Sequence, residues 1–157
     1  MADANAYLHF DGVQTYIEVP SSAEFSIAPN GGGLTISAWI RPEALAFTST
    51  EGSGYVHWLG KGEKEHQEWT FRMYSQENSE GRGNRISFYV FNPSGGLGIG
   101  SYFQDELQPR EWIHVVGAAD GERTYIYRDG AKRDSDVYAG KISPQVAEPL
   151  FVSGPAI

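Results

Sequence analysis

Residues 34–41 read Leu-Thr-Ile-Ser-Ala-Trp-Ile-Arg, and this stretch decides the class of fold. Every second residue from Leu34 to Ile40 is apolar, so an extended chain places these side chains on one face. The Thr, Ser, Trp and Arg side chains alternate with them and fall on the opposite face. A period of two is typical of a β-strand that is buried on one side. Pro42 ends the run, because proline cannot continue the hydrogen-bond ladder.

Similar short runs recur along the chain, separated by turn-forming residues. The other predicted strands are Ala6–Phe10, Tyr16–Val19, Tyr55–Leu59, Trp69–Ser75, Arg85–Phe91, Gly98–Phe103, Trp112–Ala119, Thr124–Arg128, Ala131–Asp136 and Leu150–Val152. Asp129-Gly130 is typical of a two-residue hairpin turn. No stretch of 11 or more residues has a helical period, and only a short turn is expected around Ala23–Ile27. The pattern predicts an all-β antiparallel sandwich and leaves open whether it is a jelly roll or immunoglobulin-like.

Composition and charge exclude several classes of function. The 157 residues contain no cysteine, which excludes disulfides, thiolate metal sites and cysteine nucleophiles. The net charge of −8 argues against nucleic acid or an acidic membrane surface as a partner, because both require a basic face. The sequence contains no run of 18 apolar residues, so it predicts no membrane-spanning helix. The length favours one domain over residues 1–157. An extracellular or virion-surface location is favoured, although the charge fits a cytosolic protein equally well.

Three segments share their order and spacing with one known family. They are Tyr7-Leu8-His9-Phe10-Asp11-Gly12 followed by Tyr16-Ile17-Glu18-Val19-Pro20, then Leu34-Thr35-Ile36-Ser37-Ala38-Trp39-Ile40-Arg41-Pro42, and finally Trp112-Ile113-His114-Val115-Val116 with Tyr125-Ile126-Tyr127-Arg128-Asp129-Gly130. This combination resembles the laminin-G-like, concanavalin A-like lectin/glucanase domains. The resemblance covers about residues 6–152 and implies a jelly-roll sandwich of two curved antiparallel sheets. It implies function only weakly, because this fold hosts many unrelated roles.

One departure from the family concerns the end of the domain. Members usually close with a strand of the type Gly-x-Ile-Asp-x-Val-x-Ile-Tyr beside the first strand, whereas this sequence ends at Ser153-Gly154-Pro155-Ala156-Ile157. Either the sequence is truncated, or the strand is supplied elsewhere, or the edge is left open. An open apolar edge invites pairing with another chain. We therefore expect Ala6–Phe10 to be completed by a swapped strand or a subunit interface, which predicts a homo-oligomer.

Asp11 is the candidate metal ligand. The resemblance implies that an early aspartate near this turn helps to hold a calcium ion at the rim of the sandwich. Calcium prefers six to eight oxygen ligands, which carboxylates and backbone carbonyls supply. The alternative is that Asp11 forms a turn beside Gly12 and binds no cofactor.

The segment Glu63-Lys64-Glu65-His66-Gln67-Glu68 offers a catalytic alternative. The spacing of its carboxylates resembles the Glu-x-Asp-x-x-Glu motif of retaining glucanases built on this fold, in which two carboxylates act as nucleophile and acid/base. The middle residue here is Glu65 instead of aspartate, and the motif must lie within a strand. A solvated, charged hairpin tip is the favoured interpretation, so we expect no catalytic residue.

Outward-facing aromatic residues are the best indication of a binding surface. Sugars present flat C–H faces that stack on rings, while their hydroxyl groups pair with polar side chains. If the apolar positions of 69–75 and 85–91 face the core, the alternate positions face out. The predicted ligand-binding residues on one sheet face are Arg72, Tyr74, Tyr89, Phe91 and Tyr102. The alternative is that these rings pack under long loops.

These observations favour a non-catalytic recognition module that binds carbohydrate or a protein partner. The first alternative is a structural assembly or decoration protein of a phage or cell surface, completed by strand pairing between subunits. The second is a glycoside hydrolase that depends on Glu63, Glu65 and Glu68.

Overall fold

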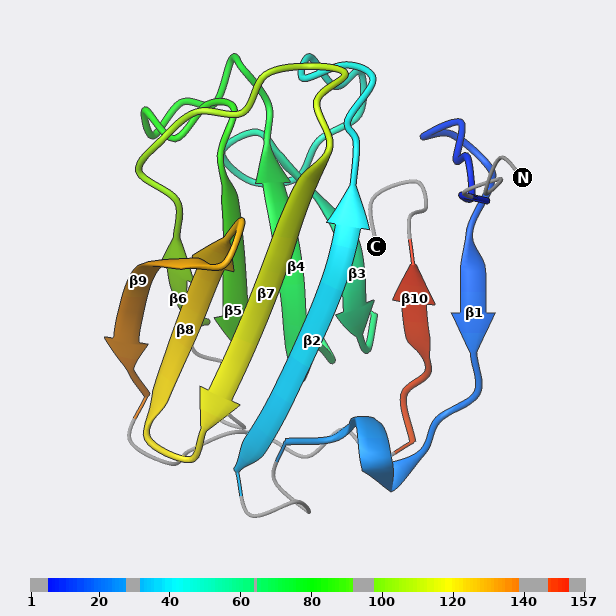
Figure 1. Cartoon of the computed structure of the whole chain (residues 1–157). Coiled ribbons are helices and arrows are strands. Elements are labelled where there is room, and N and C mark those ends of the chain that lie inside the picture. The colour runs from blue at the N-terminus through cyan, green and yellow to red at the C-terminus, as the bar shows by residue number, and fades with distance from the viewer. Residues whose placement is uncertain (1–5, 28–31, 64, 92–97, 139–146, 153–157) are drawn as a thin grey trace, which may run out of the picture.

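The computed structural model describes residues 6–27, 32–63, 65–91, 98–138 and 147–152. They form two antiparallel β-sheets packed face to face (Figure 1). The six-stranded sheet has the order β1-β10-β3-β4-β5-β6, and the four-stranded sheet has the order β2-β7-β8-β9. The bounds are β1 Ile17–Val19, β2 Gly33–Ile40, β3 Tyr55–Lys61, β4 Trp69–Tyr74, β5 Ile86–Val90, β6 Ile99–Tyr102, β7 Ile113–Asp120, β8 Arg123–Arg128, β9 Ala131–Val137 and β10 Leu150–Val152. The predicted jelly-roll sandwich is confirmed.

The alternation that predicted β2 sets its orientation. All eight residues of β2 pair with β7 without a register shift, from Gly33 opposite Asp120 to Ile40 opposite Ile113. The even-numbered apolar side chains face the other sheet and the odd-numbered ones face outward. On the outer face the Trp39 ring stacks on His114 with centroids 5.1 Å apart.

The core lies where β4 and β5 face β7 and β8. Phe71 and Phe88 are fully buried, with ring centroids 4.9 Å apart. Gly117 of β7 lies against both rings, because a Cβ atom built there would come within 2.7 Å of Phe88 Cδ2. A glycine at this position therefore lets the two sheets approach closely.

The core is not covered equally on all sides. The apolar side chains of β5, β7 and β8 that face inward are buried, whereas several on β2, β3 and β10 are only half-buried. The half-buried residues are Leu34, Ile36, Ile40, Val56, Trp58, Leu150 and Val152. Figure 1 shows the reason, because β10 and β1 extend beyond the outer edge of β2 with no strand of the other sheet in front of them.

The prediction of a strand at Ala6–Phe10 is wrong. These residues adopt no regular structure, and Tyr7 and Leu8 expose 61% and 70% of their surface. The first strand is β1, which pairs with β10. An alternating segment becomes a strand only where it pairs with a neighbouring edge, and within the described residues no strand pairs with Ala6–Phe10.

The short turn expected around Ala23–Ile27 is confirmed as a 3-10 helix, η1, over Ala23–Phe25. Ser22 caps it, since its Oγ accepts a hydrogen bond from the backbone N–H of Glu24. Within the described residues, none of the helical structure has the length and hydrophobicity required to traverse a bilayer.

Candidate functional site

The predicted ligand-binding residues lie together on the outer face of the six-stranded sheet. The register places Arg72 of β4 opposite Ser87 of β5, and Ser87 opposite Tyr102 of β6. Directly opposed residues share a face. Tyr55 and His57 of β3 extend the same face, because they pair with Tyr74 and Arg72. We name the set Tyr55, Arg72, Tyr74, Arg82, Tyr89, Phe91 and Tyr102 the aromatic–arginine face.

Arg72 is held between aromatic rings at the centre of this face. Its Cζ atom lies 4.3 Å from the ring centroid of Tyr55 and 4.4 Å from that of Tyr89. The Phe91 ring follows at 5.5 Å. Aromatic faces attract a guanidinium group electrostatically, and Arg also stacks on them. The cation is therefore fixed in position before any ligand arrives.

Arg82 joins the face from the loop that connects β4 to β5. It lies 4.9 Å above the Tyr102 ring and donates a 2.9 Å hydrogen bond to the hydroxyl of Tyr89. Burial, and then the neighbouring Tyr74, raise the pKa of Tyr89 to about 12. The Tyr89 hydroxyl is therefore neutral at physiological pH. Tyr74 itself is 1% exposed, so its hydroxyl contacts Ser87 instead of solvent.

His57 lies beneath the rings, beside Arg72. It is 2% exposed, and its Nδ1 forms a 2.7 Å hydrogen bond with Oγ1 of Thr70. Nε2 of His57 and Nε of Arg72 are both buried, and neither has a hydrogen-bond partner among the described residues. Burial, and secondarily the positive charge of Arg72, lower the pKa of His57 to about 3. The imidazole is therefore neutral, and the face carries unused hydrogen-bonding capacity.

The buried imidazole predicts an acid-sensitive fold. Between about pH 6.5 and pH 3, His57 is protonated in the unfolded chain but neutral in the native state. The free energy of unfolding should therefore fall with decreasing pH over that window, by up to about 1.4 kcal/mol per pH unit. Urea unfolding at pH 7.0, 5.5 and 4.5 measures this slope. His57→Gln should flatten it, whereas a variant of the exposed His9, His9→Gln, should keep it. Equal slopes in both variants would contradict the assignment.

The sequence-based set did not include Tyr55 and Arg82 of this face, nor the His57 that lies beneath it. Tyr55 and His57 flank the apolar Val56 in β3, so the alternation of the sequence could have placed both on the outer face. Arg82 lies in the β4–β5 loop, where no periodicity indicates the direction of a side chain. The alternation of β4 and β5 correctly predicted that Arg72, Tyr74 and Tyr89 share one face of the sheet, and their role in binding stays a prediction.

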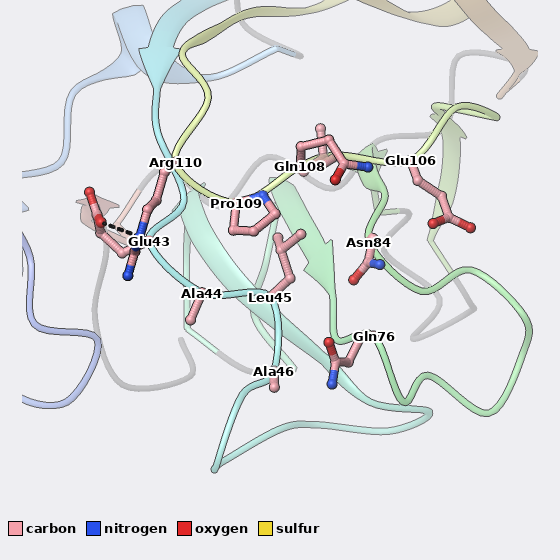
Figure 2. Close-up of a pocket in the computed structure, with 11 residues that line it drawn as sticks. Glu43, Ala44, Leu45, Ala46, Gln76, Asn84, Glu106, Gln108, Pro109 and Arg110 are labelled. Atoms are coloured by element: carbon pink, nitrogen blue, oxygen red, sulfur yellow. Dashed lines mark ion pairs between the residues drawn. The ribbon is translucent and has the colours of Figure 1, made fainter.

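A polar cleft of about 720 Å³ lies at the loop end of the sandwich. Figure 2 shows Leu45 and Pro109 near its centre, with Gln76 and Asn84 on one side and Glu43 and Arg110 on the other. Glu43 is held by Arg41 at 2.6 Å and by Arg110 at 3.8 Å. The cleft shares the β4–β5 loop with the aromatic–arginine face but contains no aromatic side chain.

Asp11 forms the turn that was the alternative to a calcium site. One carboxylate oxygen, Oδ1, accepts hydrogen bonds from the backbone N–H groups of Val13, Gln14 and Thr15 and from the Thr15 hydroxyl. These bonds hold the pKa of Asp11 well below its usual range. Among the described residues, no cluster of three or more His, Asp or Glu side chains that could hold a metal ion is found. Calcium binding at Asp11 stays a prediction.

The three glutamates considered for catalysis lie in different environments. Glu63 and Glu65 are exposed in the loop between β3 and β4. Glu68 was expected in a solvated loop, but it is fully buried, and its carboxylate accepts hydrogen bonds from Ser26 and from the backbone N–H of Ile27. The segment lies between strands and not within one, unlike the motif that it resembles.

Comparison with known proteins identifies the family. The sequence profile described as the concanavalin A-like lectin/glucanases superfamily matches residues 11–155. The chain therefore belongs to this superfamily, as the three sequence segments indicated. No curated protein sequence matches the chain significantly.

Solved structures share the fold at low sequence identity. A putative carbohydrate binding protein from Bacteroides ovatus superposes with a TM-score of 0.60 at 15% identity, over 87% of this chain and 34% of that one. Domains LG4-5 of the mouse laminin α1 chain superpose with a TM-score of 0.57 at 13% sequence identity, over 89% of this chain and 31% of that one. Domain 4 of an extracellular arabinanase from Geobacillus stearothermophilus, in complex with arabinotriose, superposes with a TM-score of 0.52 at 11% sequence identity. The match covers 78% of this chain and 52% of that one. The chain thus spans about a third of the first two structures and half of the third.

Proposed function

We propose that this domain is a non-catalytic carbohydrate-recognition module whose ligand lies on the aromatic–arginine face. The observation that carries the proposal is the guanidinium of Arg72, fixed between Tyr55 and Tyr89. Half-buried rings beside it offer flat apolar surface to the C–H faces of a sugar. The N–H groups of the two arginines supply donors for its hydroxyl groups. The superfamily and two of the similar structures, one a putative carbohydrate binding protein and one holding arabinotriose, support this choice.

The face is ordered in advance, which favours binding. A flexible arginine loses rotamer entropy when it contacts a ligand, and that loss weakens affinity. Here the rings and the Arg82–Tyr89 hydrogen bond already hold the side chains in place. The polar cleft at the loop end is the competing location, because Gln, Asn and Glu side chains also bind sugar hydroxyls.

A panel of immobilised oligosaccharides that includes arabinotriose tests the proposal, followed by calorimetry on any saccharide that binds. Arg72→Gln should weaken binding about 10–100-fold, because a charged hydrogen-bond donor contributes about 1.5–3 kcal/mol. Gln108→Ala in the cleft is the matched control and should leave the affinity within about twofold. The reverse pattern would place the ligand in the cleft. Binding of no saccharide at millimolar concentration would contradict carbohydrate recognition.

A further inference from the structure

We propose, resting on the function proposed above, that the saccharide bound on the aromatic–arginine face is acidic. Its anionic group, a carboxylate or a sulfate ester, pairs with the guanidinium of Arg72. A saccharide ligand by itself could equally be neutral, because arginine also donates hydrogen bonds to hydroxyl groups. The surroundings of Arg72 favour the charged class.

Arg72 is a half-buried cation without a counter-charge in the described part of the chain. No described carboxylate forms an ion pair with it, and its buried Nε–H donor has no described partner. The other half-buried arginines each have an acidic partner. Arg41, Arg82, Arg85 and Arg128 pair with Glu43, Glu80, Glu106 and Asp105, respectively. A partly desolvated charge that lacks a partner costs free energy, which an anionic ligand would offset.

The sheet face around Arg72 carries no acidic side chain. The register of β3, β4, β5 and β6 gives the residues that point outward from these strands. They are Tyr55, His57, Gly60, Thr70, Arg72, Tyr74, Ser87, Tyr89, Gly100 and Tyr102. The chain as a whole has 20 acidic residues against 12 lysines and arginines. The positive charge of Arg72 therefore stands on a locally acid-free surface of an acidic protein.

Two carboxylates at the margin of this face already have partners. Glu80 lies 3.6 Å from Nε of Arg82. Asp134 of β9 accepts a hydrogen bond from the backbone N–H of Tyr102 at the edge strand β6. Arg82 thus has a counter-charge of its own, and Arg72 is the group on this face that a ligand anion would neutralise.

The aromatic rings strengthen an ion pair at Arg72. Tyr55 on β3 and Tyr89 on β5 lie on either side of its strand, with ring centroids 4.3 and 4.4 Å from Cζ. Ring surfaces exclude water, and charges attract each other more strongly where water is excluded. A carboxylate or sulfate can accept two parallel N–H bonds from the planar guanidinium. A sugar hydroxyl leaves its charge uncompensated.

Phe91 and Tyr89 offer a surface for the sugar ring that carries the anion. The Phe91 centroid lies 5.5 Å from Cζ of Arg72. The two rings are neighbours, with centroids 6.4 Å apart and planes inclined by 34°. A uronic acid carries its carboxylate on a carbon attached to the pyranose ring. Stacking on these rings and pairing with Arg72 can therefore occur in one ligand residue.

An array of matched oligosaccharides tests the proposal on the unaltered protein. Oligomers of galacturonate, glucuronate and mannuronate are immobilised as free acids and as methyl esters, and maltooligosaccharides are immobilised with and without sulfate esters. Each pair shares its sugar rings and differs in charge. The charged form should bind at least about tenfold more tightly in calorimetry, because its hydrogen bonds to the guanidinium join two opposite charges.

Variants assign the preference to one side chain. With Arg72→Gln, the charged form should bind no more tightly than its neutral partner. Arg72→Lys keeps the charge without the planar fork and should retain part of the preference. Arg123→Gln is the matched control, because it removes one exposed positive charge from β8 of the other sheet. It should leave both affinities within about twofold. Circular dichroism verifies that each variant is folded.

The outcomes separate this proposal from carbohydrate recognition as such. A preference among the uronate pairs identifies the anion as a carboxylate, and one among the sulfated pairs identifies it as a sulfate ester. Equal binding of charged and neutral forms by the unaltered protein would overturn the acidic class and leave the proposed function intact. A preference that survives in Arg72→Gln would overturn the pairing with Arg72. Binding of no saccharide, charged or neutral, would contradict the proposed function as well.

Discussion

Replacement of Glu68 by alanine should lower the free energy of unfolding by about 3–5 kcal/mol, as expected for removing one partner of a buried ionic network. Glu68 is fully buried, and its carboxylate accepts hydrogen bonds from Ser26 Oγ and the Ile27 backbone. Lys61, also fully buried, donates a 2.7 Å hydrogen bond to the Glu148 carbonyl. Burial lowers the pKa of Lys61, whereas the nearby carboxylates of Glu68 and Glu148 oppose that shift. Glu68→Ala removes this compensation and leaves buried donors unsatisfied.

Two matched variants separate charge from shape at this position. Glu68→Gln keeps a hydrogen-bonding group of the same size but removes the charge, so its cost should be intermediate. Glu63→Ala changes an exposed loop glutamate and should alter stability by less than about 0.5 kcal/mol. Urea unfolding monitored by tryptophan fluorescence gives all three values. A loss of less than about 1 kcal/mol for Glu68→Ala would show that the network does not stabilise the fold.

Phe88→Ala should destabilise the protein by a similar amount, about 3–5 kcal/mol. The Phe88 ring is fully buried, with centroids 4.9 Å from Phe71 and 6.4 Å from Trp69. It also lies directly against Gly117 of the opposite sheet. Truncation removes apolar burial and leaves a cavity that the rigid sheets fill only partly. Thermal and urea unfolding measure the loss.

The contact with Gly117 makes this prediction testable by a double-mutant cycle. Gly117→Val alone should cost about 1–3 kcal/mol, because its side chain overlaps the rings of Phe71 and Phe88. Combined with Phe88→Ala, the new side chain occupies the vacated space. The double variant should then be more stable than the sum of the two losses predicts, by about 0.5–3 kcal/mol. Strict additivity would mean that the two positions do not share the packing that the structure shows.

The sequence predicted strands correctly where a segment of alternating apolar and polar residues also pairs with a neighbouring strand in the structure. The apolar positions of residues 34–41, 69–75 and 85–91 face the core as expected, so the outward positions of the aromatic–arginine face followed from them. Alternation is a local property of the chain and is readable without the partner strand. The same property led to a wrong prediction at Ala6–Phe10, where the pattern is present but no strand in the described part of the chain pairs with it.

Other features depend on long-range contacts that no local pattern reveals. Glu68 resembles an exposed loop residue, yet Ser26 and Ile27, more than 40 positions earlier, bury and bind its carboxylate. Arg82 reaches the aromatic–arginine face from an irregular loop. The pKa of His57 depends on the burial that the assembled sheet imposes and on Arg72, which lies opposite it on β4.

The uneven covering of the core has a consequence for motion. Amides in β4, β5 and β7 lie within the fully buried part of the sandwich, so their exchange requires disruption of most of the domain. β1 and β10 have three residues each and lie at the uncovered side. Because these strands are short and partly uncovered, their local opening should require less free energy than global unfolding. The domain thus has two regions that should open at different frequencies.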